Sequence, residues 1–139
     1  MKLEIFATTA LLSTVFMATP VRAANPAHVR QLIETRECMG CNLAGANLNG
    51  AHLIGADLRD ANLEGASLID ANLEGADLTG ANLQQANLFE AFATGASMNE
   101  VNLTDANLQN ASLYKVDMDG ATIAGTDFRG AKLYGANLF

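Results

Sequence analysis

Two cysteines three positions apart are the residues of this chain that are best suited to chemistry. They are Cys38 and Cys41, in the segment CMGC, and the chain has no other cysteine. A C-x-x-C pair performs thiol-disulfide exchange when a thioredoxin-like βαβ pattern surrounds it, and no such pattern flanks this segment. In an exported chain the same pair forms a structural disulfide. We expect a disulfide between Cys38 and Cys41, and redox chemistry and free thiols are the alternatives.

The other polar residues form neither a metal site nor a catalytic constellation. A zinc site needs four ligands, and the only histidines are His28 and His52, which we expect to be solvated surface side chains. No nucleophile, base and orienting residue can be assembled from the sequence, and no glycine-rich phosphate loop precedes a helix. We therefore expect no catalytic residue, no cofactor and no metal, and the protein is not expected to be an enzyme.

The charge balance and the N-terminal segment bear on partners and location. The chain has 15 acidic and 8 basic residues, a formal charge of -7, which argues against nucleic acid because that affinity rests on clustered Lys and Arg. Residues 1–23 read as a secretory signal peptide, in which Lys2 precedes an apolar run and small residues lead to Ala23. The run is shorter than the ~20 residues that span a bilayer. We expect export without stable membrane insertion after cleavage, and an uncleaved anchor is the alternative.

A five-residue repeat runs without interruption from residue 41 to residue 139. Its twenty centres, from Leu43 to Leu138, are all apolar, and the position two residues before each centre is Ala in sixteen units. Residues five apart would scatter around a helix, and on a continuous strand they would alternate between faces. The chain must therefore bend once per pentapeptide and wind as a coil around a leucine core. Gly ends eleven of the units, which suits a corner with left-handed backbone.

The pattern A(D/N)LXX over residues 41–139 resembles the pentapeptide repeat family. The resemblance implies an all-β solenoid, a right-handed quadrilateral parallel β-helix of about five coils with four faces per coil. Residues 24–40 are expected to form a capping helix and linker, with the helix over residues 26–36, because Asn25 suits an N-cap and Pro26 the first helical position. Gyrase-inhibiting members of the family dimerise tail to tail with the help of a helical extension. This sequence lacks that extension, so a monomer is expected over a dimer.

With four faces per coil, residues twenty apart stack, which sorts the outward side chains into surfaces. One face displays six carboxylates against Arg59 alone, and we expect it to be strongly acidic. These carboxylates are Asp57, Asp60, Asp77, Glu100, Asp117 and Asp119. Another face, with its neighbouring corner, gathers exposed apolar side chains, as binding patches do. This candidate surface for an unidentified protein partner consists of Phe92, Tyr114, Tyr134, Ile54 and Phe89.

These features favour a non-catalytic structural or protein-protein interaction scaffold that is exported from the cytoplasm. The exported form resembles pentapeptide repeat proteins of cyanobacteria, which implies a periplasm or thylakoid lumen. One alternative is an acidic DNA mimic that binds a topoisomerase such as gyrase, as the quinolone-resistance members do. The signal segment opposes it because gyrase is cytoplasmic. A second alternative is a thiol-disulfide module that uses Cys38 and Cys41.

Overall fold

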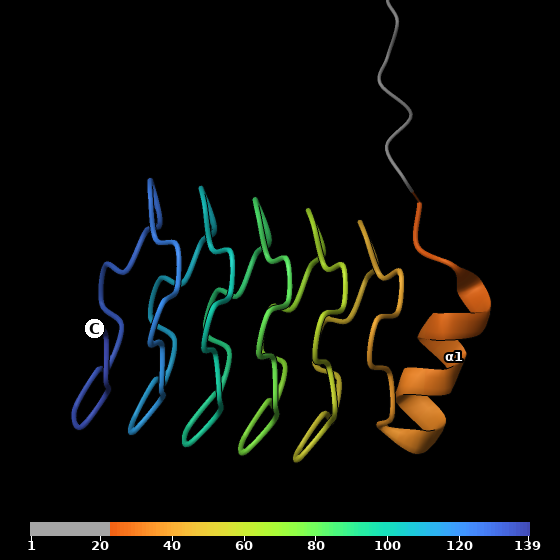
Figure 1. Ribbon diagram of the computed structural model, residues 1–139, viewed down its shortest axis with the longest axis horizontal. Helices are drawn as coiled ribbons and strands as arrows, with labels where there is room; N and C mark the ends of the chain where they lie inside the picture. The colour runs from red at the N-terminus through yellow and green to blue at the C-terminus, as the bar shows by residue number, and fades with distance from the viewer. Residues whose placement is uncertain (1–22) are drawn as a thin grey trace, which may run out of the picture.

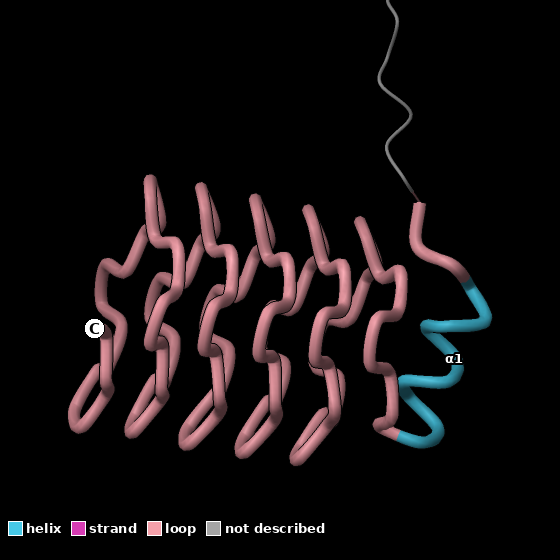
Figure 2. Tube along the Cα trace, in the orientation of Figure 1, coloured by secondary structure: helices cyan, strands magenta, loops and turns pink. Residues whose placement is uncertain are grey.

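The chain forms a rod of stacked coils with one short helix at its N-terminal end (Figure 1). The computed structural model describes residues 23–139, so the signal peptide expected at residues 1–23 lies outside the described residues except for Ala23. Helix α1, Pro26–Thr35, is the single helix of the described residues, and turns joined by isolated bridge residues make up the coils (Figure 2). No helix within residues 23–139 has the length and apolarity needed to cross a membrane.

The residues that flank helix α1 determine where it begins and ends. The backbone N–H of Ala27 donates to Oδ1 of Asn25 at 2.9 Å, and Pro26 occupies the first turn, where an N–H would have no helical partner. Arg36 has left-handed backbone with φ of 61°, and its N–H donates to the carbonyl of Leu32 at 2.9 Å. The helix therefore stops one residue before the end expected from the sequence. Leu32 is fully buried and belongs to the core of the coils.

Parallel bridges join residues twenty positions apart along the whole rod. Asn62 pairs with Asn82, and the N–H of Leu63 donates to the carbonyl of Asn82 at 2.7 Å. The amide side chains of Asn62 and Asn82 are also hydrogen-bonded, at 3.4 Å. A step of twenty residues holds four pentapeptides, so the coil has four sides. The bridges run from Glu37 to Asn137, and they begin one pentapeptide before the repeat that is visible in the sequence.

Each corner places the last residue of a pentapeptide in left-handed backbone. The N–H of Ala46 donates to the carbonyl of Leu43 at 3.0 Å, and Gly45 inside this turn has φ of 68°. Glycine adopts this conformation without a steric cost. Eight units place another residue there, as at Glu90 with φ of 57°. The left-handed backbone of the corners therefore favours glycine at this position without requiring it.

The second residue of a pentapeptide holds the turn that follows it. The N–H of Glu64 donates to Oδ1 of Asn62 at 3.1 Å, and the N–H of Thr79 donates to Oδ1 of Asp77 at 3.0 Å. Asn and Asp side chains often accept a hydrogen bond from the backbone two residues on. We call this interaction the turn bond. It explains why the repeat prefers Asp or Asn at this position.

The centres of the pentapeptides form one continuous hydrophobic core. Every centre from Leu43 to Met118 is buried, with no more than 2% of its surface exposed. Burial decreases in the last coil, where Ile123 is 36% exposed and Phe128 and Leu133 are only partly buried. The leucine-filled axis expected from the sequence is therefore confirmed over most of the rod.

Candidate functional site

One side of the rod, which we call the aromatic face, carries the centres Leu53, Leu73, Ala93, Leu113 and Leu133. Its second-position residues form one column of parallel bridges that runs the length of the rod. The column consists of His52, Asn72, Phe92, Ser112 and Lys132. Residues that are forty positions apart in the sequence therefore lie only two coils apart on this surface.

The structure brings three residues of the expected partner surface into one region. Phe92, Tyr114 and Tyr134 lie in three successive coils of the aromatic face and are 51%, 37% and 82% exposed. Ile54 is also exposed, but it lies three coils from Tyr114 in the same column. Phe89 is half-buried on the neighbouring side. The exposed rings therefore gather toward the C-terminal half of the rod.

The aromatic face departs from the turn chemistry of the other three sides. Among the described residues, only Asn72 of its five column residues makes the turn bond, which it accepts from the N–H of Glu74 at 3.0 Å. Each of the other sides holds at least three turn bonds. At position 92 an exposed ring replaces a side chain that would hold the backbone. Such a break of a local folding rule is typical of functional surfaces.

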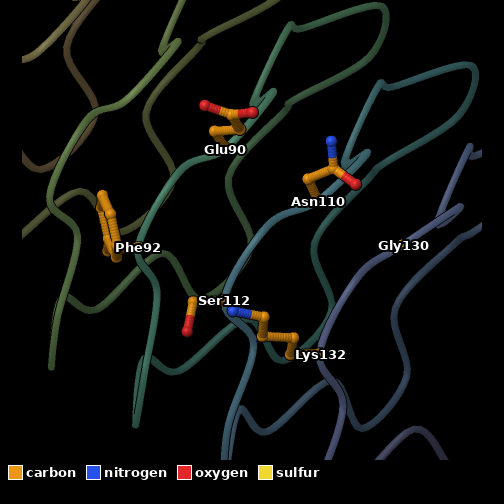
Figure 3. A pocket seen from close by; sticks show the side chains of 6 residues that line it. All are labelled: Glu90, Phe92, Asn110, Ser112, Gly130 and Lys132. Atoms are coloured by element: carbon orange, nitrogen blue, oxygen red, sulfur yellow. The ribbon is translucent and has the colours of Figure 1, made fainter.

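A groove with a volume of about 370 Å³ crosses the aromatic face (Figure 3). Its size is at the lower end of the ~300–1,000 Å³ typical of ligand pockets. Two columns of stacked residues line the groove. Each column contributes three residues, one from each of three successive coils. They are Glu90, Asn110 and Gly130 at the corner, and Phe92, Ser112 and Lys132 on the face. Of these, only Phe92 was expected in a site, and the twenty-residue register was the one signal in the sequence that could have found the others.

Lys132 and Glu90 give the groove opposite charges at its two ends. Within residues 23–139, no carboxylate lies within 4.0 Å of the Lys132 ammonium, whereas Arg59 and Arg129 each pair with an aspartate at 2.6 Å. The ammonium end of Lys132 points toward Ser112 in the middle coil (Figure 3). Glu90 lies in the coil of Phe92, two coils away from Lys132. The groove therefore has a direction along the rod.

The acidic face lies on the side that follows the aromatic face along each coil, and its charges are partly engaged. Arg59 lies 2.6 Å from Asp57 and 3.9 Å from Asp77. The hydrogen bond from Arg59 holds the pKa of Asp57 below its usual value. Asp117 accepts hydrogen bonds from the side chains of Asn99 at 3.2 Å and Asn137 at 2.9 Å. These carboxylates therefore also serve as links between coils.

Cys38 and Cys41 form the disulfide expected from the sequence. Cys38 occupies the place of a centre leucine and Cys41 that of a repeat alanine, and they are 0% and 4% exposed. Thiol-disulfide exchange requires that an attacking thiolate reach one of the sulfurs. The burial of both residues therefore suits a structural bridge better than a redox centre.

His28 has a structural partner, so the expectation that it is a solvated side chain was wrong. The backbone N–H of Asn42 donates to Nδ1 of half-buried His28 at 2.9 Å. In the next coil the corresponding N–H of Asn62 donates to the carbonyl of Cys41 at 2.8 Å. His28 thus supplies the hydrogen-bond acceptor that a preceding coil would otherwise provide. His52 is exposed, and no three His, Cys, Asp or Glu side chains within residues 23–139 are arranged to hold a metal ion.

The fold and its surfaces define the class of this protein as a solenoid built from pentapeptides. The chain belongs to the pentapeptide repeat family, because the model of pentapeptide repeats matches residues 37–75, 66–105 and 102–138. Proteins of this family fold as right-handed quadrilateral β-helices, which agrees with the four-sided coil described above.

Several solved structures are similar to this chain. A pentapeptide repeat protein from Nostoc Pcc 7120 is 33% identical, with a TM-score of 0.66 over 82% of this chain and 94% of that one. A pentapeptide repeat protein from the Arabidopsis thaliana thylakoid lumen is 35% identical, with a TM-score of 0.43 over 76% and 68%. QnrB1, a plasmid-mediated fluoroquinolone resistance protein, is 21% identical, with a TM-score of 0.49 over 72% and 63%. Comparison with curated proteins gives no match.

Proposed function

We propose that this protein is a non-catalytic scaffold that binds a protein partner through its aromatic face. The observation that carries the proposal is the exposure of Phe92, Tyr114 and Tyr134 on the one side where most turn bonds are missing. Large exposed rings that cluster on one side are typical of binding surfaces. The rest of the rod holds this side in a fixed shape, because each coil is bonded to its neighbours.

The scaffold is proposed to be a rod of about five coils that helix α1 closes at the N-terminal end. Open ends of a sheet expose backbone groups that invite association. The helical segment supplies partners for two sides of the first coil. The backbone N–H of Asn25 donates to the carbonyl of Asn42 at 3.0 Å, and the side chain of Gln31 donates to the carbonyl of Glu37 at 2.7 Å. Together with the buried Leu32, these contacts support a capping role.

The proposed surface is tested by replacing Phe92, Tyr114 and Tyr134 together with Ser. Partners of the wild-type and variant proteins are then captured from cells by cross-linking and compared. We expect at least one reproducible partner of the wild type to be missing from the variant. An unchanged set of partners would contradict the proposed surface.

A control changes three residues at the repeat position of Tyr114 and Tyr134, the fourth of the unit, on another side of the rod. Glu64, Gln84 and Thr104 occupy this position on the side of Asn62, opposite the aromatic face. Their replacement with Ser should leave the captured partners unchanged. Thermal unfolding of both triple variants shows whether either change acts through the fold instead.

We further propose that the protein is exported to a periplasm or thylakoid lumen and acts there. The buried disulfide of Cys38 and Cys41 supports an oxidising compartment, because cytosolic proteins rarely keep such bonds. Fractionation of cells that carry the tagged full-length chain, with N-terminal sequencing of the product, tests this location. A mature chain that begins at Ala24 is expected. An uncleaved chain in the membrane fraction would contradict it.

A second candidate function, an acidic DNA mimic that binds a topoisomerase such as gyrase, rests on the acidic face. Asp57, Asp77 and Asp117 belong to one column, and Asp60, Glu100 and Asp119 are exposed beside it. Arg59 and the hydrogen bonds of Asp117 weaken this candidate, since they engage part of the charge. Inhibition of gyrase supercoiling by the purified mature protein would favour this function over the scaffold.

A further inference from the structure

We propose that the groove at Phe92 binds an extended segment of the partner protein in which an apolar and an acidic side chain stand two positions apart. This inference rests on the proposed function, because it names the chemistry of the partner at the same aromatic face. The apolar side chain packs on the ring of Phe92, and the carboxylate pairs with Lys132. Three observations lead to this assignment.

The first observation is the exposed ring of Phe92. Half of its surface is accessible, and it lines the groove beside the small side chain of Ser112. Burying an aromatic ring against an apolar side chain is favourable, and such rings often serve as anchors in protein interfaces. The ring therefore selects an apolar side chain at this end of the groove.

The second observation is the charge of Lys132. Among the described residues it has no carboxylate partner within the distance at which Arg59 and Arg129 hold theirs. An ammonium group that is free in the unbound protein can pair with a carboxylate from outside without first breaking an internal ion pair. Lys132 therefore selects an acidic side chain.

The third observation is the distance along the rod. Neighbouring coils are ~4.8 Å apart, and an extended segment advances ~3.4 Å per residue with every second side chain on the same side. Lys132 lies two coils from Phe92, but its ammonium end points back toward Ser112 in the middle coil (Figure 3). Side chains two positions apart, about 7 Å, therefore match the separation of the two contacts.

Glu90 and Asn110 give the groove a preferred direction of binding. Glu90 lies at the Phe92 end and repels a carboxylate there, which disfavours a segment bound in the reverse sense. The amide of Asn110 and the hydroxyl of Ser112 can both donate to and accept from a peptide backbone. A nucleic acid is disfavoured, because the groove holds a single cation and the chain carries a net charge of -7.

The probe for this inference is a phage-displayed library of random twelve-residue peptides, selected on the oxidised mature protein. We expect the enriched peptides to share an apolar residue and an Asp or Glu two positions apart. Enriched peptides without acidic residues, or no enrichment above an uncoated surface, would overturn the proposal. If no peptide is enriched but the protein binds a glycan on an array and Lys132→Glu abolishes that binding, the proposal is overturned and the ligand of the groove is a carbohydrate.

Fluorescence anisotropy with the most enriched peptide then assigns the two contacts. Lys132→Glu and Phe92→Asn should each weaken binding about tenfold, and the wild-type affinity should fall as salt is raised. Lys115→Glu is the matched control, since it makes the same charge change on the same face outside the groove. It should change the affinity less than about threefold. Equal losses from Lys132→Glu and Lys115→Glu would show a general charge effect and overturn the groove assignment.

The outcomes separate this inference from the proposed function. If the aromatic triple variant loses its cellular partner but Lys132→Glu keeps it, the scaffold function stands and the acidic segment is wrong. If the aromatic triple variant keeps every partner, the proposed function itself fails. Melting temperatures of the variants that are no lower than that of the wild type exclude unfolding as the cause.

Discussion

At the scale of the single residue, the side chain at the second position of a pentapeptide either stabilises the turn that follows it or is exposed at the surface. Asn62 and Asp77 use their side chains to accept the N–H of the following turn. Phe92 has no side-chain acceptor and exposes a ring instead. The same backbone position thus carries a folding role at Asn62, Asp77 and Asn72 and, by our proposal, a binding role at Phe92.

Replacing Phe92 with Asn should therefore raise stability while it removes the proposed binding anchor. The new side chain can accept the N–H of Thr94, and a net hydrogen bond of this kind contributes about 0.5–1.5 kcal/mol. Urea unfolding followed by circular dichroism measures the free energy of unfolding. The reverse change in the same column, Asn72→Phe, removes an existing turn bond and should lower it by a similar amount. A Phe92→Asn variant less stable than the wild type would show that the ring serves the fold.

The disulfide makes a second prediction at this scale. The double variant Cys38→Ala and Cys41→Ala should lose about 2 kcal/mol of unfolding free energy, because the bridge closes only a short loop. Chemical reduction of the wild type should have a similar effect once the buried bond is reached. The purified protein should show no turnover in a thiol-exchange assay with a peptide disulfide. Turnover above that of the double variant would revive the thiol-disulfide module.

At the scale of the element, helix α1 and its flanks replace a missing coil. The first coil would otherwise present the N–H and carbonyl groups of Glu37 and Asn42 without partners from the chain before them. Thr35 accepts the N–H of Glu37 at 3.1 Å, and His28 accepts that of Asn42 at 2.9 Å. The helix therefore continues the hydrogen bonding of the ladder on two sides of the rod.

The variant His28→Ala should destabilise the N-terminal end of the rod. It leaves the part-buried N–H of Asn42 without its acceptor, a loss that costs about 1 kcal/mol, the lower end of the range for buried donors. Hydrogen exchange of the Asn42 amide should accelerate more than that of amides in the central coils, because a solenoid responds locally. His52→Ala is the control and should change stability by less than about 0.5 kcal/mol, since His52 is exposed. Equal effects of the two variants would contradict the capping role of His28.

The elements also show which features a sequence can reveal. The repeat predicts the core and the corners because every unit from Leu43 onward obeys the same steric demand. The unit at Cys38 escapes the pattern, since cysteines occupy its centre and the following alanine position, yet it pairs with Asp57 like any other unit. The partner of His28 could not be predicted, because it depends on how the helix lies on the first coil. The residues that line the groove could not be predicted, because Glu90 and Ser112 have no distinguishing feature in the sequence. Only the twenty-residue register of the coils brings them together.

At the scale of the whole molecule, the rod separates its surfaces by side. The aromatic face and the acidic face share one corner, which Ile54 and Asp57 flank along the coil. Apolar and acidic surfaces that meet at an edge allow one partner to contact both, with the charges directing its approach. On the side opposite the aromatic face, the amide hydrogen bond between Asn62 and Asn82 links neighbouring coils.

The same charge distribution predicts that the protein is a monomer at micromolar concentration. The end of the rod at Ile123 and Phe128 exposes part of the core, which favours association. A symmetric contact there would bring each molecule's surface against a copy of itself, including the exposed carboxylate of Asp119, in a chain of net charge -7. Sedimentation velocity of the mature protein at about 0.15 M salt, where charges are screened beyond ~8 Å, should give one species of monomer mass. A dimer that strengthens as salt is raised would show that the apolar end outweighs the repulsion, and Phe128→Ser should then restore the monomer.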